Sequence, residues 1–172
     1  MNPENQLNPV GFVQSVLQRV QTDNAFGAAM RRADNLNLCS AAWEYLVPYC
    51  NLAKESERLA FSLVGAAIAR EKPHQDGIAS FGKALRSLCK GDADALEREA
   101  RRFRRVIACD TIEELFPVLR PMLQYLQSQG GAPLCYRDLL KDLLSWSERT
   151  RLRWTQDFYG KESLGEKQEE AK

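Results

Sequence analysis

The sequence is poor in the side chains that most often hold metals or carry enzymatic chemistry. It has one histidine, His74, in a polar loop, so no histidine cluster can bind a metal ion. The five cysteines are widely spaced and include no C-x-x-C pair. Motifs of zinc proteases, phosphate-binding loops, serine hydrolases and dinucleotide-binding folds are absent. We therefore expect no catalytic residue, no metal site and no cofactor.

Acidic residues are the remaining candidates for chemistry. Asp92, Asp94 and Glu97 could hold Mg²⁺, and the protein would then be an unrecognised helical nuclease. Their position offers a simpler explanation, because Asp92 is expected to cap a helix and acidic side chains in the first turn favour the helix dipole. Glu113 and Glu114 are explained in the same way. The nuclease stays an open but secondary hypothesis.

The chain also lacks a long apolar run. The longest candidate, residues 60–69, is far shorter than the roughly 20 apolar residues that a membrane-spanning helix needs. The N-terminal segment MNPENQLNP has neither the basic start nor the apolar stretch of a secretory signal. We expect a cytoplasmic protein whose cysteines are reduced and mostly lie in the core. These are Cys39, Cys50, Cys89, Cys109 and Cys135.

Apolar spacing and capping residues predict helices almost throughout. No segment shows the sustained period-two alternation of a β-strand. The expected helices cover 9–21, a short stretch after Asp23, a stretch capped by Ser40 that stops before Pro48, 53–71, 78–90, 93–109, Thr111 to Gly130, and 134–159 as one helix or two. The fold class is therefore all-α, a compact bundle of about eight helices.

Residues 1–160 are expected to form a single all-α domain. A division into two packed subdomains, about 8–91 and 92–160, is left open. The charged tail, residues 161–172, has almost no apolar residues and is predicted to be disordered. Pro117 and Pro121 lie inside the helix after Thr111 and should kink or shorten it.

Positive charge is concentrated in one segment although the net charge is only +1. Residues 97–105 read EREARRFRR. On a helical wheel an apolar stripe faces the core: Leu96, Ala100, Phe103 and Ile107. The opposite face carries four arginines: Arg98, Arg101, Arg102 and Arg105. A solvated face usually mixes charges of both signs, whereas this one places arginine beside arginine. Because guanidinium groups suit phosphate, the pattern favours a polyanion-binding surface. A helical adaptor that binds an acidic protein through this face is the alternative.

Other basic residues are also expected to point outward. They are Arg31 and Arg32 in the short helix expected after Asp23, Lys83 and Arg86 in the helix expected over 78–90, and Arg149 and Arg151 before Trp154. If helix packing brings these faces to one side, they form a basic groove for a nucleic-acid strand. The sequence alone does not decide whether they converge.

Several segments carry a family resemblance through their order and spacing. They are DNAFGAAMRRA (23–33), WEYLVPYC (43–50), IASFGKALRSL (78–88), ARRFRRVIACDTIEELFPVLRPML (100–123) and LLSWSERTRLRWTQDFY (143–159). Together they cover most of residues 20–160. In this order they resemble the small subunit (the CasB family) of the type I-E CRISPR surveillance complex, Cascade.

The resemblance implies a small, non-catalytic, all-α subunit. Such proteins sit as two copies, head to tail, against the backbone subunits that hold the CRISPR RNA and the large subunit. Their basic surface helps to hold the RNA–DNA hybrid and the displaced DNA strand in an R-loop, where base pairing supplies the sequence specificity. No membrane is implied, and the process is antiviral defence. Pro117 and Pro121 depart from the family pattern.

The resemblance carries over to particular residues: Arg31, Arg32, Lys83, Arg101, Arg102, Arg120, Arg149 and Arg151. Combined with the helical wheel, it predicts sequence-independent contacts with the CRISPR RNA and with the target and non-target DNA strands. The predicted contact residues are Arg31, Arg32, Lys83, Arg86, Arg98, Arg101, Arg102, Arg105, Arg120, Arg149 and Arg151.

Overall fold

The computed structural model describes residues 7–160, so the tail predicted to be disordered lies outside the described residues. Within them the chain forms nine α-helices and one 3₁₀ helix. The β-type pairing in this range is a single bridge between Ala79 and Leu134. The all-α prediction is confirmed. None of the described helices combines the length and the apolar character needed to cross a membrane.

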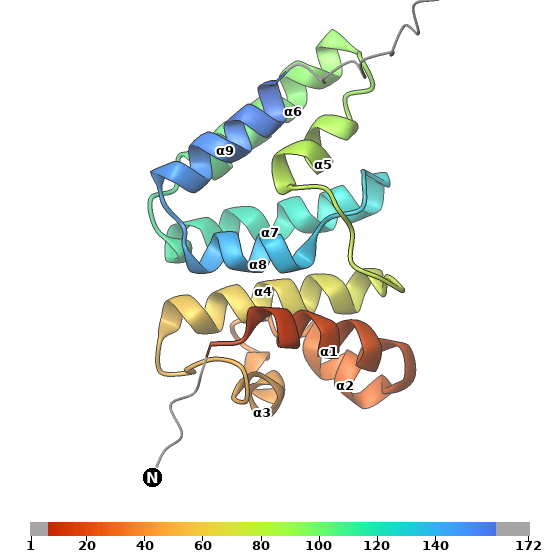
Figure 1. Cartoon of the computed structure of the whole chain (residues 1–172), viewed down its shortest axis with the longest axis vertical. Coiled ribbons are helices and arrows are strands. Elements are labelled where there is room, and N and C mark those ends of the chain that lie inside the picture. Colours follow the sequence, from red (N-terminus) through yellow and green to blue (C-terminus); the bar gives the residue numbers. More distant parts are fainter. Residues whose placement is uncertain (1–6, 161–172) are drawn as a thin grey trace, which may run out of the picture.

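The helices stack in layers along the long axis of the molecule (Figure 1). The lowest layer contains α1 (Pro9–Thr22), α2 (Asn24–Arg31), the 3₁₀ helix η1 (Cys39–Ala42) and α3 (Trp43–Leu46). Asp23 caps α2 as predicted, because its side chain accepts a hydrogen bond from the Phe26 amide. Ser40 does not cap a helix as expected, since η1 already begins at Cys39 and has no side-chain cap.

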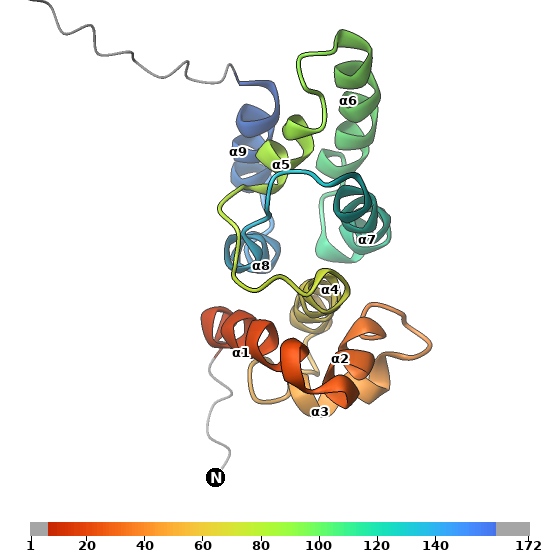
Figure 2. The same cartoon turned by 90° about the vertical axis from the view of Figure 1, so that its right-hand side faces the viewer.

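The central helix is α4 (Glu55–Glu71), and every residue from Leu59 to Ala69 is buried. It lies across the middle of the molecule, with α1 and α2 below it and α7 (Ile112–Gln129) and α8 (Tyr136–Leu144) above it (Figures 1 and 2). Because α4 is covered on both sides, it joins the lower and upper parts in one hydrophobic core.

Pro117 and Pro121 do not shorten the helix after Thr111, because α7 continues through both to Gln129; the alternative, that they kink it, stays a prediction. Both prolines are exposed, so their rings meet solvent rather than a packed neighbour. The helical hydrogen bonds that they remove would end at the carbonyl groups of Glu113 and Pro117, which are exposed residues, so water can replace the missing N–H donors. Gly130 ends the helix as predicted, in the left-handed conformation with φ 65°.

The uppermost layer consists of α5 (Phe81–Ser87), α6 (Ala93–Ile107) and α9 (Glu148–Tyr159). Figure 2 shows α5 between α6 and α9. The helix predicted over 78–90 is shorter than expected, because residues 78–80 are extended and Ala79 pairs with Leu134. The region 134–159 forms two helices, α8 and α9.

Contacts cross the subdomain boundary that the sequence left open near residue 91. In the lower half α4 packs on α7 and α8, and in the upper half α5 packs on α9. Asp76 adds a polar link, because its Oδ1 accepts a hydrogen bond of 2.7 Å from the Tyr136 amide and its Oδ2 one of 3.2 Å from the Arg137 amide. The division into two subdomains stays a prediction.

Candidate nucleic-acid interface

The arginine-rich helix α6 begins where the sequence predicts, because the Asp92 side chain accepts a hydrogen bond from the Asp94 amide. Its buried face is wider than the predicted stripe. Leu96 and Ile107 are only partly buried, whereas these five residues are buried: Ala95, Glu99, Ala100, Phe103 and Val106. The reason is that α6 packs on more than one neighbour. It contacts α5 and α7, and Phe103 stacks on Phe158 of α9 with ring centroids 4.7 Å apart.

Glu99 is a buried carboxylate that fixes one of the arginines. It is 2% exposed, and its Oε1 accepts hydrogen bonds of 2.8 Å from both Arg102 and the Tyr125 hydroxyl of α7. The Arg102 guanidinium also lies over the Tyr125 ring, 4.2 Å from its centroid, as in a cation–π contact. Arg102 is therefore held against α7 in a fixed orientation. The sequence analysis missed Glu99 and Tyr125, although a glutamate three residues before an arginine is a local signal for this pair.

Arg101 is held more loosely. Glu97 lies 3.5 Å from Arg101 Nε and 3.4 Å from Arg104 Nη1, and the Arg104 guanidinium, followed by that of Arg101, lowers the pKa of Glu97. All three side chains are more than half exposed, and exposed ion pairs of this kind are weak. Arg101 can therefore exchange the carboxylate for another anion with little loss of free energy.

Arg98 and Arg105 are exposed and have no ion-pair partner within residues 7–160. Together with Arg101 and Arg102 they form what we call the α6 basic face. It is the largest group of predicted contact residues that the structure brings together.

Two cysteines, Cys89 and Cys109, flank α6 in the sequence and are largely buried. Burial raises the pKa of Cys89, and the guanidinium groups of Arg86 and Arg98 act in the opposite direction. Burial likewise raises the pKa of Cys109, with Arg105 and Arg151 opposing it among nearby carboxylates. The contacts show which neighbours α6 has: α5, which carries Arg86, packs on α6, and Arg151 Nη1 of α9 donates to the carbonyl of Ile107, the last residue of α6.

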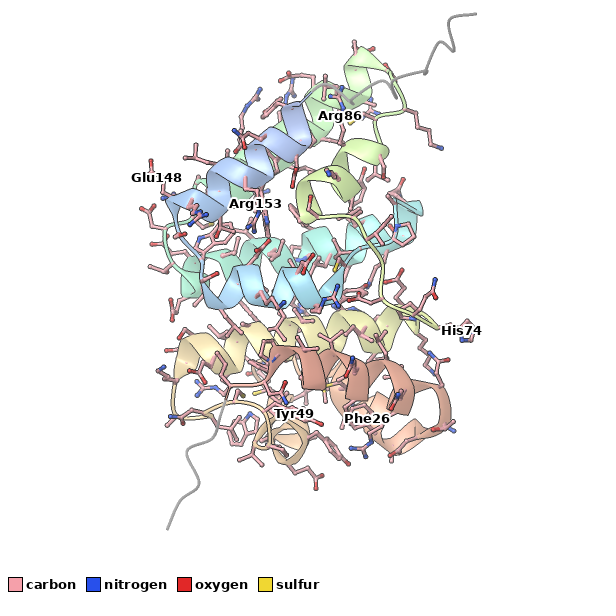
Figure 3. The ribbon with its side chains drawn as sticks, in the orientation of Figure 1. Phe26, Tyr49, His74, Arg86, Glu148 and Arg153 are labelled. Atoms are coloured by element: carbon pink, nitrogen blue, oxygen red, sulfur yellow. The ribbon has the colours of Figure 1, made fainter. Side chains whose placement is uncertain are left out.

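On α9 the predicted residues have different environments. Arg151 Nη1 donates to Asp110 Oδ1 at 2.7 Å and to the Ile107 carbonyl at 3.3 Å, so it fastens α9 to the end of α6. Arg149 is exposed and has no ion-pair partner in the described part of the chain. Arg153, which is labelled in Figure 3, was not a predicted contact residue. It pairs with Asp142, whose second oxygen accepts a hydrogen bond of 2.7 Å from Trp154 Nε1.

The structure does not gather all the predicted residues. Arg31 and Arg32 are exposed at the end of α2, in the layer farthest from α6 (Figures 1 and 2). Arg120 Nε lies 3.3 Å from Oδ1 of the buried Asp34, whose other oxygen accepts a 2.7 Å hydrogen bond from Arg70. Because Arg120 and Arg70 share one buried carboxylate, this cluster joins α4 and α7 and serves the fold.

A cleft of about 260 Å³ lies between α6 and α7. Arg102 and Arg105 line one side of it, and Val118, Met122 and Tyr125 line the other. Cations beside an apolar and aromatic wall suit a nucleotide, because phosphate contacts the guanidinium groups while a base meets the wall. Tyr125 is therefore a candidate contact residue that the sequence alone did not indicate.

The described residues contain no group of three or more histidine, cysteine or carboxylate side chains that could hold a metal. Asp92 caps α6 and Glu97 pairs with arginines, so two of the three residues of the nuclease hypothesis have structural roles. His74 is exposed at the tip of the loop after α4 (Figure 3). All five cysteines are free, and four of them are buried, as expected for core residues.

Comparison with known proteins places the chain in a family. Residues 27–159 match the sequence model of the CRISPR-associated protein Cse2 family (CRISPR_cse2). The chain belongs to the Cse2 family. None of the curated proteins compared with it matches significantly by sequence.

Solved structures of Cse2 and CasB proteins have a similar fold. A Cse2-family CRISPR-associated protein from Thermus thermophilus is 25% identical, with a TM-score of 0.67, over 94% of this chain and 100% of that one. CasB from M. ruber is 24% identical, with a TM-score of 0.68, over 88% and 92% of the two chains. A chain of a CRISPR RNA-guided surveillance complex is 24% identical, with a TM-score of 0.67, over 86% and 87%.

Proposed function

We propose that this Cse2-family protein is the non-catalytic small subunit of a type I-E CRISPR RNA-guided surveillance complex, Cascade. In this role it binds the backbone and large subunits of the complex and a second copy of itself in the cytoplasm. It contacts the backbones of the CRISPR RNA and of the target and non-target DNA strands, and so stabilises the R-loop during antiviral defence. Family membership and the likeness to a chain of such a complex support this role.

The observation that carries the proposal is the α6 basic face. Arg98 and Arg105 have no carboxylate partner within residues 7–160, Arg101 has only a weak one, and Arg102 is pre-oriented by Glu99. Exposed arginines that repel one another reduce stability slightly, so their placement is explained by an anion that neutralises them. A sugar–phosphate strand provides such charges at regular spacing, and it needs no base-specific contact because the guide RNA reads the sequence.

The test is R-loop formation by complexes reconstituted with Arg98→Glu/Arg105→Glu. Both side chains are exposed, so the fold should be unaffected. We expect target affinity to fall by about tenfold or more, because each lost phosphate contact removes a counterion-release contribution. The slope of log affinity against log salt should decrease by about 1.4 to 1.8 for two lost contacts.

The matched control reverses the same number of charges on α8, at Arg137 and Lys141, both of which are exposed. Affinity and salt slope should then remain those of the unmodified complex. Equal affinities and equal slopes for the α6 variant and the unmodified protein would contradict the proposal. If the α6 variant instead fails to assemble while the free protein ignores single-stranded DNA at low salt, the face binds an acidic protein, which is the adaptor alternative.

Arg31 and Arg32 provide a separate question. They lie far from the α6 basic face, so one strand segment on α6 does not reach them. We propose that this pair meets a different part of the nucleic acid, and Arg31→Glu/Arg32→Glu should lower affinity independently of the α6 substitutions.

A further inference from the structure

Ile78 is the most exposed large apolar residue in the described part of the chain, with 94% of its surface accessible. Neither the fold nor the α6 basic face uses its side chain. A single exposed apolar residue is ordinary, but the surroundings of Ile78 make it more than that.

The backbone around Ile78 is rigid. The Gly77 amide donates to the Leu134 carbonyl at 3.2 Å, and the amides of Ile78 and Ala79 donate to the Pro133 carbonyl at 3.2 and 3.0 Å. The two segments approach so closely at Gly77 that a Cβ there would lie 2.2 Å from the Pro133 carbonyl oxygen. The isoleucine is thus presented in a fixed place, so little conformational entropy is lost when a partner covers it.

A hollow of about 700 Å³ lies beside Ile78 and includes it in its wall. Ala79, Ala132 and Pro133 supply further apolar surface, and Lys83 and Arg86 supply positive charge. The one carboxylate of the wall, Asp157, already accepts a 2.6 Å hydrogen bond from the Ser80 hydroxyl. The hollow therefore combines a protruding apolar side chain, which we call the Ile78 knob, with an apolar surface beside it and two cations.

We infer that the Ile78 hollow docks a partner protein, through a segment in which an apolar side chain is flanked by carboxylates. The apolar side chain covers Ile78, and the carboxylates pair with Lys83 and Arg86. A nucleic-acid strand fits less well, because a backbone of phosphates and sugars has little use for a fully exposed aliphatic side chain. Buried apolar anchors beside charged rims are typical of protein–protein interfaces. The identification of the partner as a subunit of the surveillance complex rests on the proposed function.

The first test is assembly with the other subunits of the surveillance complex. Ile78→Ser removes the knob from an exposed position, so it leaves the free chain folded. We expect the variant to bind the rest of the complex about tenfold or more weakly, and Ile78→Leu to restore binding. Leu152→Ser is the matched control, because Leu152 is 58% exposed on α9 and lies outside the hollow; it should assemble normally.

Assembly of Ile78→Ser at the affinity of the unmodified chain would overturn the inference. So would weaker binding of Ile78→Ser to single-stranded DNA with assembly unchanged, since the occupant is then nucleic acid. Deleting residues 161–172 from the unmodified chain provides the third arm. An unchanged assembly affinity after this deletion supports a partner as the occupant. A tenfold gain in affinity would mean that the chain's own tail competes for the hollow, which overturns the inference.

A second test does not depend on the proposed function. Two peptides, acetyl-Glu-Leu-Glu-Leu-amide and acetyl-Gln-Leu-Gln-Leu-amide, are titrated into the free protein while backbone amide resonances are recorded. The acidic peptide should shift the resonances of Ala79, Lys83 and Ala132, and Ile78→Ser should abolish the shifts. Identical responses to both peptides, or none, would overturn the hollow as an acidic-segment site even if the complex assembles. Failure of the unmodified chain to assemble, with the peptide shifts present, would instead overturn the proposed function alone.

Discussion

Helices α4 and α6 have similar lengths, 17 and 15 residues, but they differ in how much of their surface is buried. In α4 every residue from Leu59 to Ala69 is buried, whereas α6 buries only five residues and exposes most of its arginines. The first helix is covered on both sides by other layers, and the second closes the outer edge of the upper layer (Figure 2). The difference teaches that buried apolar surface is concentrated around α4, whereas α6 carries exposed positive charge, the feature on which the proposed anion binding rests.

Each region also contains a buried carboxylate, and the two carboxylates bind different partners. Asp34 is shared by Arg70 of α4 and Arg120 of α7 and lies in the interior of the bundle. Glu99 holds Arg102 and Tyr125 at the edge of the α6–α7 cleft. The first anion joins α4 to α7 in the interior, and the second holds Arg102 against Tyr125 of α7 at the edge of the cleft.

The largest effect is expected in the core around α4. Leu63 is fully buried, and Leu63→Ala should lower the free energy of unfolding by about 3 kcal/mol, because it leaves a cavity in a packed core. Arg101→Ala on α6 should leave the unfolding midpoint unchanged. Urea unfolding followed by circular dichroism measures both. Comparable losses for the two variants would abolish the distinction between the regions.

A smaller effect is expected at the buried anion of the interior. Asp34→Asn keeps the shape but removes the charge, which leaves the guanidinium groups of Arg70 and Arg120 uncompensated. The loss should be about 2 kcal/mol, less than for a fully enclosed pair, since 38% of the Arg120 side chain still reaches water. Glu97→Gln on α6 provides the control in the same urea experiment, and its midpoint should not move. A stable Asp34→Asn variant would show that packing alone joins α4 to α7.

Near neutral pH the smallest effect is a pH dependence that originates beside α4, because it develops only in alkaline solution. Burial raises the pKa of Cys50 to about 12, and burial followed by Glu71 also raises the pKa of Tyr136. Because the folded state keeps these protons longer than the unfolded chain, the contribution of these two groups to stability should be constant below about pH 8.5 and should decline as pH rises from there toward 12. Thermal midpoints from about pH 7.5 to 10.5 measure the decline. Cys50→Ala should make the decline of the thermal midpoint with pH less steep. An unchanged slope would exclude the Cys50 thiol as the source of the decline.

Much of the fold could be predicted from local sequence. Local residue types predict where three helices begin or end: Asp23 caps α2, Asp92 caps α6, and Gly130 ends α7. The extended stretch at 78–80 could not be predicted, because its pairing partner, Leu134, lies far along the chain and leaves no local signal. Likewise, the uninterrupted α7 depends on its prolines facing solvent, which only the packed structure decides.

The outward direction of the arginines at the candidate site was predicted, but their contacts with neighbouring side chains were not. A helical wheel assigns each residue one direction, and it correctly turned Arg98 and Arg105 outward. The wheel treats the helix as though it had a single neighbour, whereas α6 packs on several, and so the predicted stripe does not include the buried Glu99. Whether Arg120 and Arg32 join the same surface depends on the arrangement of distant helices, about which a wheel contains no information.

The position of α5 has a consequence for biosynthesis. This helix packs on α9, and Ser80 bonds to Asp157 across 77 positions of sequence. A ribosome therefore delivers α5 and α6 long before the helix that completes their layer. The lower layers can consolidate on the nascent chain, but the arginine-bearing end stays unfinished until translation is almost complete. If translation stopped shortly before α9, the released chain would have an intact interior but an incomplete upper layer. The aromatic residues of that layer would be exposed to solvent, and the chain would tend to aggregate.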